Sequence, residues 1–266
     1  MRLFKFAEMK RIIFIALALL SGFLARAQEG SDFPFRAFKP MYFIGGVPLQ
    51  GPVNKSTAGF KFQFSTAIPL WEHISGRDGL DLRFGYTQIS VWDFFDNSSP
   101  FRDNCFSPGL YLSVPLKDGG LRFGLEHKSN GRPMRGTEGD TFSRSINYFF
   151  GEYGAFFPSG LVLKAQLRAG IGWYDEELTQ EVFSRFQGYA DFTAGYQGEK
   201  WQAAATLTPL FGPPGVNIEA GVARKIGFGS FFAQFNYGYG EALTDWVRGY
   251  RPPPYLRIGI LFGNLL

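Results

Sequence analysis

Apolar and polar residues alternate over most of the chain. In residues 161–173, every odd position from 163 onward is apolar, and Lys164, Gln166 and Arg168 lie between them. An alternation with a period of two places successive side chains on opposite faces of a β-strand. Twelve segments follow this pattern: 35–44, 59–68, 80–92, 107–116, 121–129, 144–152, 161–173, 185–196, 199–208, 215–223, 229–239 and 254–263.

The length and spacing of these segments favour a membrane barrel. Each is close to the roughly 9–11 residues that a tilted strand needs to cross the hydrocarbon layer of a bilayer. Tight turns such as 117–120 alternate with longer loops, and the chain is rich in aromatic residues (18%) and glycine (34 residues). A soluble β-sandwich would alternate in the same way, so the pattern alone leaves that fold open. We predict an all-β fold, a transmembrane antiparallel β-barrel of about twelve strands.

The first 27 residues have the pattern of a secretory signal peptide. Basic residues precede an apolar run at 12–20, and the small residues Ala25 and Ala27 mark the expected cleavage site. The apolar run is shorter than the about 20 residues that a membrane-spanning helix needs, which argues against an anchor. We therefore divide the chain into a signal peptide, residues 1–27, and an outer-membrane barrel domain, residues 28–266.

Charge and cysteine content narrow the function classes. Residues 1–27 hold five of the 27 Lys and Arg residues and one of the 23 Asp and Glu residues, which leaves 22 of each in the rest of the chain. A neutral chain gives no reason to expect a nucleic-acid partner. One cysteine cannot form an internal disulfide, and with two histidines a Cys/His zinc site is not expected. We expect Cys105 beside a turn at a strand end and His73 in an exposed loop.

A histidine and a serine share one face of the segment 121–129. Continuing the parity of the apolar positions 121, 123 and 125 places His127 and Ser129 on the same, lipid-facing side. Residues two apart on a strand have Cα atoms about 6.5–7 Å apart, so an imidazole nitrogen can reach the hydroxyl. That contact allows a histidine to remove the serine proton and activate the oxygen as a nucleophile. Polar groups on the outer wall of a barrel cost stability, so packing gives no reason for the pair.

The next segment supplies a residue that can orient the histidine. Ser143, Ser145 and Asn147 share one face, and Asn147 can reach the second imidazole nitrogen across the hairpin. A neutral amide there would fix the ring orientation and the tautomer, as an aspartate does in the commoner triad. An HxS pair also arises by chance, and a polar residue near a loop can simply lie at the water interface. Parity alone therefore leaves both interpretations open.

Two runs in this region resemble the signature segments of the outer-membrane phospholipase A family: HKSNGR at 127–132 and SRSIN at 143–147. Further similar segments are KFQFS at 61–65, YTQISVW at 86–92, SSPFR at 98–102 and GYGEALTDW at 238–246. The resemblance covers nearly the whole chain after residue 27, in order. It implies a twelve-stranded, calcium-dependent barrel that hydrolyses acyl esters of phospholipids and lysophospholipids in the outer membrane.

The resemblance also implies roles for individual residues. Ser129 would be the nucleophile, His127 the general base and then acid, and Asn147 the orienting residue. The amide of Gly131 would form part of the oxyanion hole, with a calcium-bound water as the other part. Lys128 occupies a position that is often acidic or an amide in the family.

A calcium site is part of what the resemblance implies. Its ligands would be the hydroxyl of Ser143, the backbone carbonyl of Arg132 and the carbonyl of Ser98 from a partner subunit, and Asp140 matches an acidic residue near the metal. The ten residues 133–142 form a longer connection than the family has, and Ser98 lies closer to Trp92 than is usual. Both departures affect the loops that would hold calcium, so the metal geometry is less well defined than the triad.

The family is regulated by reversible dimerisation, and the resemblance implies a homodimer here. Gln88 continues the parity of Leu82, Phe84 and Tyr86, which points its amide towards lipid, where an unpaired amide is costly. Pairing with a second copy across a two-fold axis would satisfy it. A parity shift of one residue would instead place Gln88 in the lumen.

The function predicted from the sequence is an outer-membrane esterase that uses a Ser–His–Asn triad and Ca²⁺ on membrane phospholipids. A different class remains as the alternative: a non-catalytic barrel, either a pore or a structural protein, on the same scaffold. A narrower alternative is an esterase or acyltransferase that acts on another membrane lipid.

Overall fold

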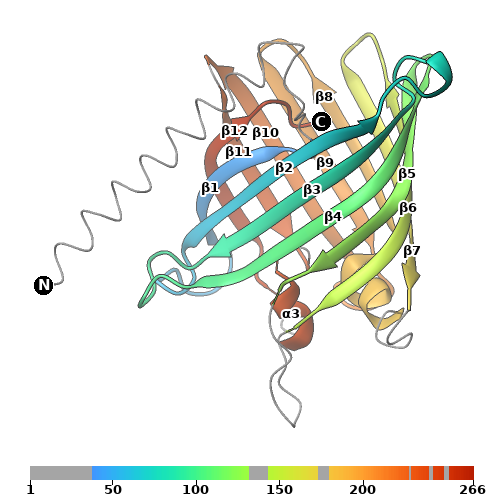
Figure 1. The fold of residues 1–266 in the computed structure, drawn as a ribbon. Helices are drawn as coiled ribbons and strands as arrows, with labels where there is room; N and C mark the ends of the chain where they lie inside the picture. Colours follow the sequence, from blue (N-terminus) through green and yellow to red (C-terminus); the bar gives the residue numbers. More distant parts are fainter. Residues whose placement is uncertain (1–37, 132–142, 173–179, 228, 240–241, 249–251) are drawn as a thin grey trace, which may run out of the picture.

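The computed structural model describes residues 38–131, 143–172, 180–227, 229–239, 242–248 and 252–266. In this part of the chain twelve strands form one closed barrel, in which consecutive strands pair antiparallel and the last strand pairs with the first (Figure 1). The strands are β1 (Met41–Pro48), β2 (Gly59–Trp71), β3 (Asp81–Trp92), β4 (Phe101–Leu116), β5 (Gly119–Ser129), β6 (Ser145–Phe156), β7 (Leu161–Ile171), β8 (Ala190–Gln197), β9 (Trp201–Pro209), β10 (Val216–Ile226), β11 (Gly229–Tyr237) and β12 (Tyr255–Phe262). The predicted twelve-stranded antiparallel barrel is therefore confirmed.

The alternation in the sequence separates an apolar outer wall from a polar lumen. On β7, Leu163 and Leu167 point outwards and are 42% and 62% exposed, whereas the side chain of Arg168 is 6% exposed inside the barrel. Exposed leucine, phenylalanine and tyrosine side chains follow the same outward parity on the other strands. This pattern suits a barrel that meets lipid outside and buries its polar groups inside.

Charged side chains in the lumen are paired across the barrel. Lys61 is almost fully buried, and its Nζ lies 3.0 Å from Oε1 of Gln234 and 3.4 Å from Oε2 of Glu219. Arg168 on β7 forms an ion pair with Asp191 on the neighbouring strand β8. Because a buried charge is stable only when it is paired and hydrogen-bonded, these contacts let the lumen hold charges. A cavity of about 590 Å³ remains between them.

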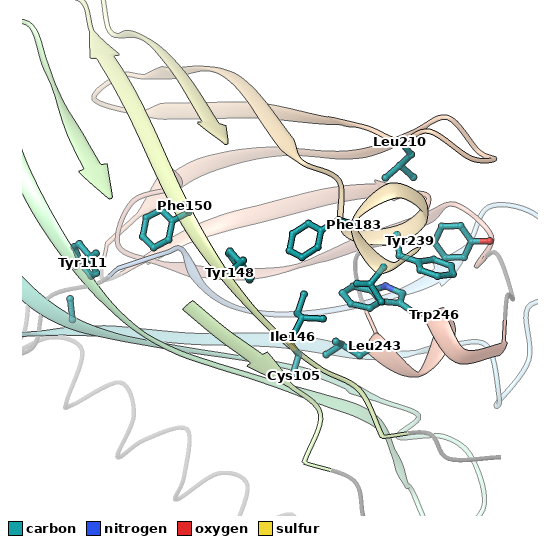
Figure 2. Packing of buried hydrophobic residues seen from close by; sticks show 13 residues of the cluster. Cys105, Tyr111, Ile146, Tyr148, Phe150, Phe183, Leu210, Tyr239, Leu243 and Trp246 are labelled. Atoms are coloured by element: carbon teal, nitrogen blue, oxygen red, sulfur yellow. The ribbon is translucent and has the colours of Figure 1, made fainter. Parts of the chain in front are cut away.

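Two helical segments fill the barrel at the end where the long loops lie, and we call them the lumen plug: η2 (Phe183–Gln187) and α3 (Leu243–Arg248). The rings of Phe186 and Trp246 are nearly parallel, with centroids 6.1 Å apart, and Phe186 meets Tyr239 edge-on at 4.9 Å. Figure 2 shows Phe183 and Trp246 among the buried side chains of the strands. The lumen plug therefore gives this end of the barrel an apolar core.

Some predicted boundaries are wrong. The first strand begins at Met41 rather than at residue 35, and Phe38 instead stacks on Tyr111 with ring centroids 4.6 Å apart. The eighth strand begins at Ala190 rather than at 185, because residues 183–187 form η2 and Gly188, with a φ of 74°, ends it. The helix α3 was not predicted.

The expected position of Cys105 is also wrong. The strand β4 begins at Phe101, six residues before the predicted 107, because residues 101–106 continue the ladder with β3. Cys105 pairs with Ile89 in this ladder and is buried inside the barrel. His73, by contrast, lies in an exposed turn, as predicted.

The signal peptide predicted for residues 1–27 lies outside the described residues and stays a prediction. Among the helices in the described ranges, none is long and apolar enough to cross a membrane.

Candidate active site

The predicted triad residues lie together on the outer wall, where β5 ends and β6 begins. The register pairs His127 with Asn147 and Ser129 with Ser145. The imidazole Nδ1 of His127 lies 2.9 Å from Oδ1 of Asn147. An amide oxygen only accepts hydrogen bonds, so Nδ1 carries the hydrogen and Nε2 keeps its lone pair. The hydrogen bond to Asn147 therefore leaves Nε2 of His127 free to accept a proton.

Ser129 shares the outward face with His127. It is half-buried between Phe106 of β4 on one side and Ser145 of β6 on the other. No hydrogen bond between the Ser129 hydroxyl and His127 is present within the described residues. The spacing of two residues on one strand still places the two side chains side by side.

Two hydrogen bonds connect Asn130, directly after β5, with Arg144, directly before β6. The N–H of Asn130 donates to the carbonyl of Arg144 at 3.1 Å, and the N–H of Arg144 donates to Oδ1 of Asn130 at 3.0 Å. Asn130 is 4% exposed. These bonds hold the residues on both sides of the loop, Gly131 and Ser143, close to the end of the β5–β6 ladder.

Gly131 has a backbone conformation that suits glycine. Its φ is 62°, in the left-handed region, and a Cβ at this position would lie 3.0 Å from a ring carbon of Phe106. A side chain would therefore meet both strain and crowding. The residue is exposed and lies two positions after Ser129.

The predicted calcium ligands are only partly within the described residues. Arg132 and Asp140 lie outside them. Ser143 is half-buried, and its carbonyl accepts a hydrogen bond from the Arg144 guanidinium at 2.9 Å. Across the described ranges, no group of three His, Cys, Asp or Glu side chains could hold a metal ion. Ser143, beside the end of the β5–β6 ladder, offers a hydroxyl and a carbonyl oxygen, both of which are ligand types that calcium accepts.

Ser98 lies in the loop between β3 and β4 and is exposed, with a φ of 63°. The indole N–H of Trp92 donates to the carbonyl of Ser99 at 3.0 Å and fixes this loop. The backbone N–H of Asn97 donates to Oδ1 of Asp96 at 2.7 Å and holds the pKa of that carboxyl below its usual value. The predicted role of Ser98 concerns a partner subunit, which a single chain does not test.

Gln88 faces outwards on β3, but its amide has partners within the chain. Its Oε1 accepts from the Tyr86 hydroxyl at 3.1 Å, and its Nε2 donates to Oγ of Ser90 at 3.1 Å. Ser90 in turn donates to Oδ1 of Asn104 at 2.7 Å. The premise of an unpaired amide in lipid was therefore wrong, although an amide can make four hydrogen bonds and still has capacity for more.

The hydrogen-bonded group around Gln88 includes two polar residues on the outer wall, Ser90 and Asn104, which were not predicted from the sequence. The parity that identified Gln88 also identifies Ser90 two residues later. Asn104 becomes its neighbour only through the β3–β4 register, which the sequence pattern does not give.

Sequence comparisons link this chain to enzymes of known class. A sequence model for the family described as phospholipase A1 matches residues 24–252. Phospholipase A1 of Proteus vulgaris is 30% identical over 208 residues, which cover 73% of this chain and 66% of that protein. Phospholipase A1 of Salmonella typhimurium is 30% identical over 203 residues, 70% of this chain and 64% of that protein. The chain thus spans slightly less than two thirds of the length of these relatives.

Solved structures share the fold. Outer membrane phospholipase A from Escherichia coli superposes with a TM-score of 0.73 at 23% identity, covering 87% of this chain and 95% of that chain. A calcium-bound dimer of Salmonella typhi outer membrane phospholipase gives 0.74 at 23% identity, with coverages of 91% and 98%. An active-site mutant of the Escherichia coli protein, with asparagine replaced by alanine, gives 0.73 at 22% identity, with coverages of 92% and 99%.

The closed barrel and its apolar outer wall make this a protein of the bacterial outer membrane, crossed by its strands. The match to the family model extends over most of the chain, from residue 24 to residue 252. The chain therefore belongs to the phospholipase A1 family.

Proposed function

We propose that this protein is an outer-membrane phospholipase that hydrolyses acyl ester bonds of phospholipids and lysophospholipids with a Ser129–His127–Asn147 triad. The observation that carries the proposal is the hydrogen bond from His127 Nδ1 to Asn147 Oδ1, made on the same outward face as Ser129. The family membership and the names of the relatives support the reaction class.

The proposed chemistry follows from this arrangement. Nε2 of His127 takes the proton of Ser129 as the serine oxygen attacks the ester carbonyl, and it then returns that proton to the leaving alcohol. Water repeats the sequence on the acyl-enzyme and releases a fatty acid. Asn147 keeps the ring in the required tautomer, and the amide of Gly131 donates to the oxyanion. Since the triad faces lipid, the substrate reaches it from the membrane.

We also propose that calcium assists the oxyanion site. A related solved structure contains bound calcium, and Ser143 lies beside the loop closure that positions Gly131. The ligands would be Ser143, Arg132, Asp140 and, from a second copy, Ser98. When bound, the ion would supply positive charge close to the developing oxyanion.

We propose a reversible homodimer that uses the wall around Gln88. A related solved structure is a dimer, and Gln88 belongs to a hydrogen-bonded group of polar side chains on the outer wall. The intrachain bonds to Tyr86 and Ser90 lower the cost of leaving Gln88 in lipid, so its contribution to dimerisation is expected to be modest.

Replacing the proposed nucleophile tests the function directly. In Ser129→Ala, the rate of phospholipid hydrolysis in mixed micelles with calcium should fall at least about 10⁴-fold, because the nucleophile is lost. Ser145→Ala, on the same face one strand away, should stay within about twofold, a difference too small to reflect a lost catalytic group. Both variants should keep the heat-modifiable gel mobility of a folded barrel. Full activity in Ser129→Ala would rule out this nucleophile and favour a non-catalytic barrel or another site.

The orienting role predicts a smaller effect at Asn147. In Asn147→Ala, kcat should fall about 10- to 100-fold, because a hydrogen bond to a charged imidazolium contributes about 1.5–3 kcal/mol. Asn147→Asp keeps the acceptor oxygen and should retain more activity than the alanine variant. Equal kcat values for Asn147→Ala and the wild type would contradict the triad.

Calcium removal should abolish hydrolysis. In Ser143→Ala the calcium concentration for half-maximal activity should rise about tenfold, with most of kcat recovered at saturating calcium, since one oxygen ligand is lost. Initial rates measured over a calcium titration after chelation check both outcomes. Undiminished hydrolysis in excess chelator would show that no calcium is needed.

The dimer proposal is tested at Gln88. By sedimentation equilibrium in detergent with calcium, Gln88→Leu should weaken the dimer about 3- to 15-fold. This range corresponds to the loss of one hydrogen bond between polar side chains inside a membrane. Tyr196→Leu, an outward substitution on β8 across the barrel, should leave association unchanged. If Gln88→Leu associates like the wild type, this wall is not the interface.

A further inference from the structure

Lys128 lies between two triad residues and points the opposite way, into the lumen. Its Nζ donates to Oε1 of Gln187 in η2 at 2.9 Å and lies 5.1 Å from the ring centroid of Trp246 in α3. Arg122 and Glu126, which also face the lumen from β5, bind side chains of the neighbouring strand β6. Lys128 therefore connects the strand that carries His127 and Ser129 to the lumen plug.

The connection occurs where the ladder between β4 and β5 is interrupted. The β4–β5 ladder pairs Phe106 with Ser129 and Gly109 with Glu126, but it skips the two residue pairs in between. The register places Pro108 opposite His127, and proline has no N–H to donate to a ladder. Pairing with β6 continues through this stretch. At His127 and Lys128 the ladder thus continues on the β6 side only.

The lumen plug can act as a support because it is tied to the barrel elsewhere. The carbonyl of Phe186 accepts a hydrogen bond from Nδ2 of Asn217 on β10 at 2.7 Å. The N–H of Thr244 donates to Oδ2 of Asp103 on β4 at 2.7 Å. The stacked rings of Phe186 and Trp246 join the two helical segments. A contact with the plug therefore fixes β5 relative to the rest of the barrel.

The partners of Lys128 are neutral. Within the described ranges the structure gives Lys128 no ion pair, and its ammonium meets an amide oxygen and an aromatic face. Glu126, two residues earlier on the same face, is bound to Lys39 and Tyr148 instead. Partly burying an ammonium that has no ion pair of its own costs free energy, so stability alone does not favour this choice of residue. Both partners belong to the lumen plug, which points to anchoring.

We propose that Lys128 is a positioning residue that holds the His127–Ser129 segment against the lumen plug and so aligns the imidazole with the hydroxyl. The proposal rests on the esterase function proposed above and deepens it. Lys128 touches neither substrate nor reacting atoms, since it lies on the other side of the barrel wall. Misplacement of a catalytic group by about 1 Å can lower a rate by about 10²-fold, so a lumen contact can control turnover.

The hydrogen bond between Lys128 and Gln187 can be removed by replacing either residue. Lys128→Met and Gln187→Leu should each lower kcat roughly 10- to 100-fold while KM stays within about twofold, as expected for misalignment without lost substrate binding. The double variant should be no worse than Lys128→Met alone, because that substitution already removes the contact with Gln187. Lys128→Arg, which can still reach Gln187, should recover most of kcat. Lys164→Met, the same substitution at a lumen position on β7 away from the plug, should match the wild type.

A second measurement separates this proposal from the function it rests on. Amide hydrogen exchange of residues 126–130, followed by mass spectrometry, should speed up in Lys128→Met and Gln187→Leu but not in Lys164→Met. If the wild type hydrolyses phospholipid and both variants match it in kcat and exchange, the positioning role is wrong and the esterase stands. If the wild type hydrolyses nothing yet exchange changes as expected, the function fails and the anchoring stands. Loss of the heat-modifiable band in both variants would show a general stability contact and would also overturn the proposal.

Discussion

The lipid-facing wall of a barrel contains no water, so each polar side chain placed there must find its partner on the same wall. This constraint shapes the candidate site. His127 on β5 bonds to Asn147 directly across the ladder, which uses the sheet register itself to orient the ring. Asn147 meets the requirement without adding a charge next to lipid. The same constraint explains the outward chain of hydrogen bonds from Tyr86 through Gln88 and Ser90 to Asn104.

The two faces of β5 have different roles in the proposed active site. Outside, alternate residues supply the proposed nucleophile and base. Inside, the residue between them contacts the lumen plug, at the place where Pro108 interrupts the ladder with β4. A barrel wall is a single β-sheet, in which successive side chains point to opposite sides. A side chain in the lumen can therefore influence a reaction on the membrane side through the backbone that it shares with the catalytic residues. The plug is thus connected to the site although it does not line it.

Period-two alternation was enough to predict all twelve strands and the outward position of His127, Ser129 and Gln88, because parity depends only on the sequence. It failed at residues 185–187, which were predicted as the start of a strand but belong to η2, where Phe183 and Phe186 follow a helical spacing. It could not give the partners of Gln88 or of Lys128, since both depend on cross-strand register or on contacts across the lumen. Arg132 and Asp140 lie outside the described residues, so the proposed calcium site stays a prediction.

The central claim is that Ser129 is an activated nucleophile on the membrane face of the barrel. The most direct measurement is reaction of the wild-type protein with a long-chain alkylsulfonyl fluoride in detergent and calcium, followed by peptide mass spectrometry. The account predicts one adduct, on Ser129, that forms as activity disappears and that does not form in His127→Ala. Inactivation with the adduct on another residue, or full labelling of Ser129 in His127→Ala, would contradict it.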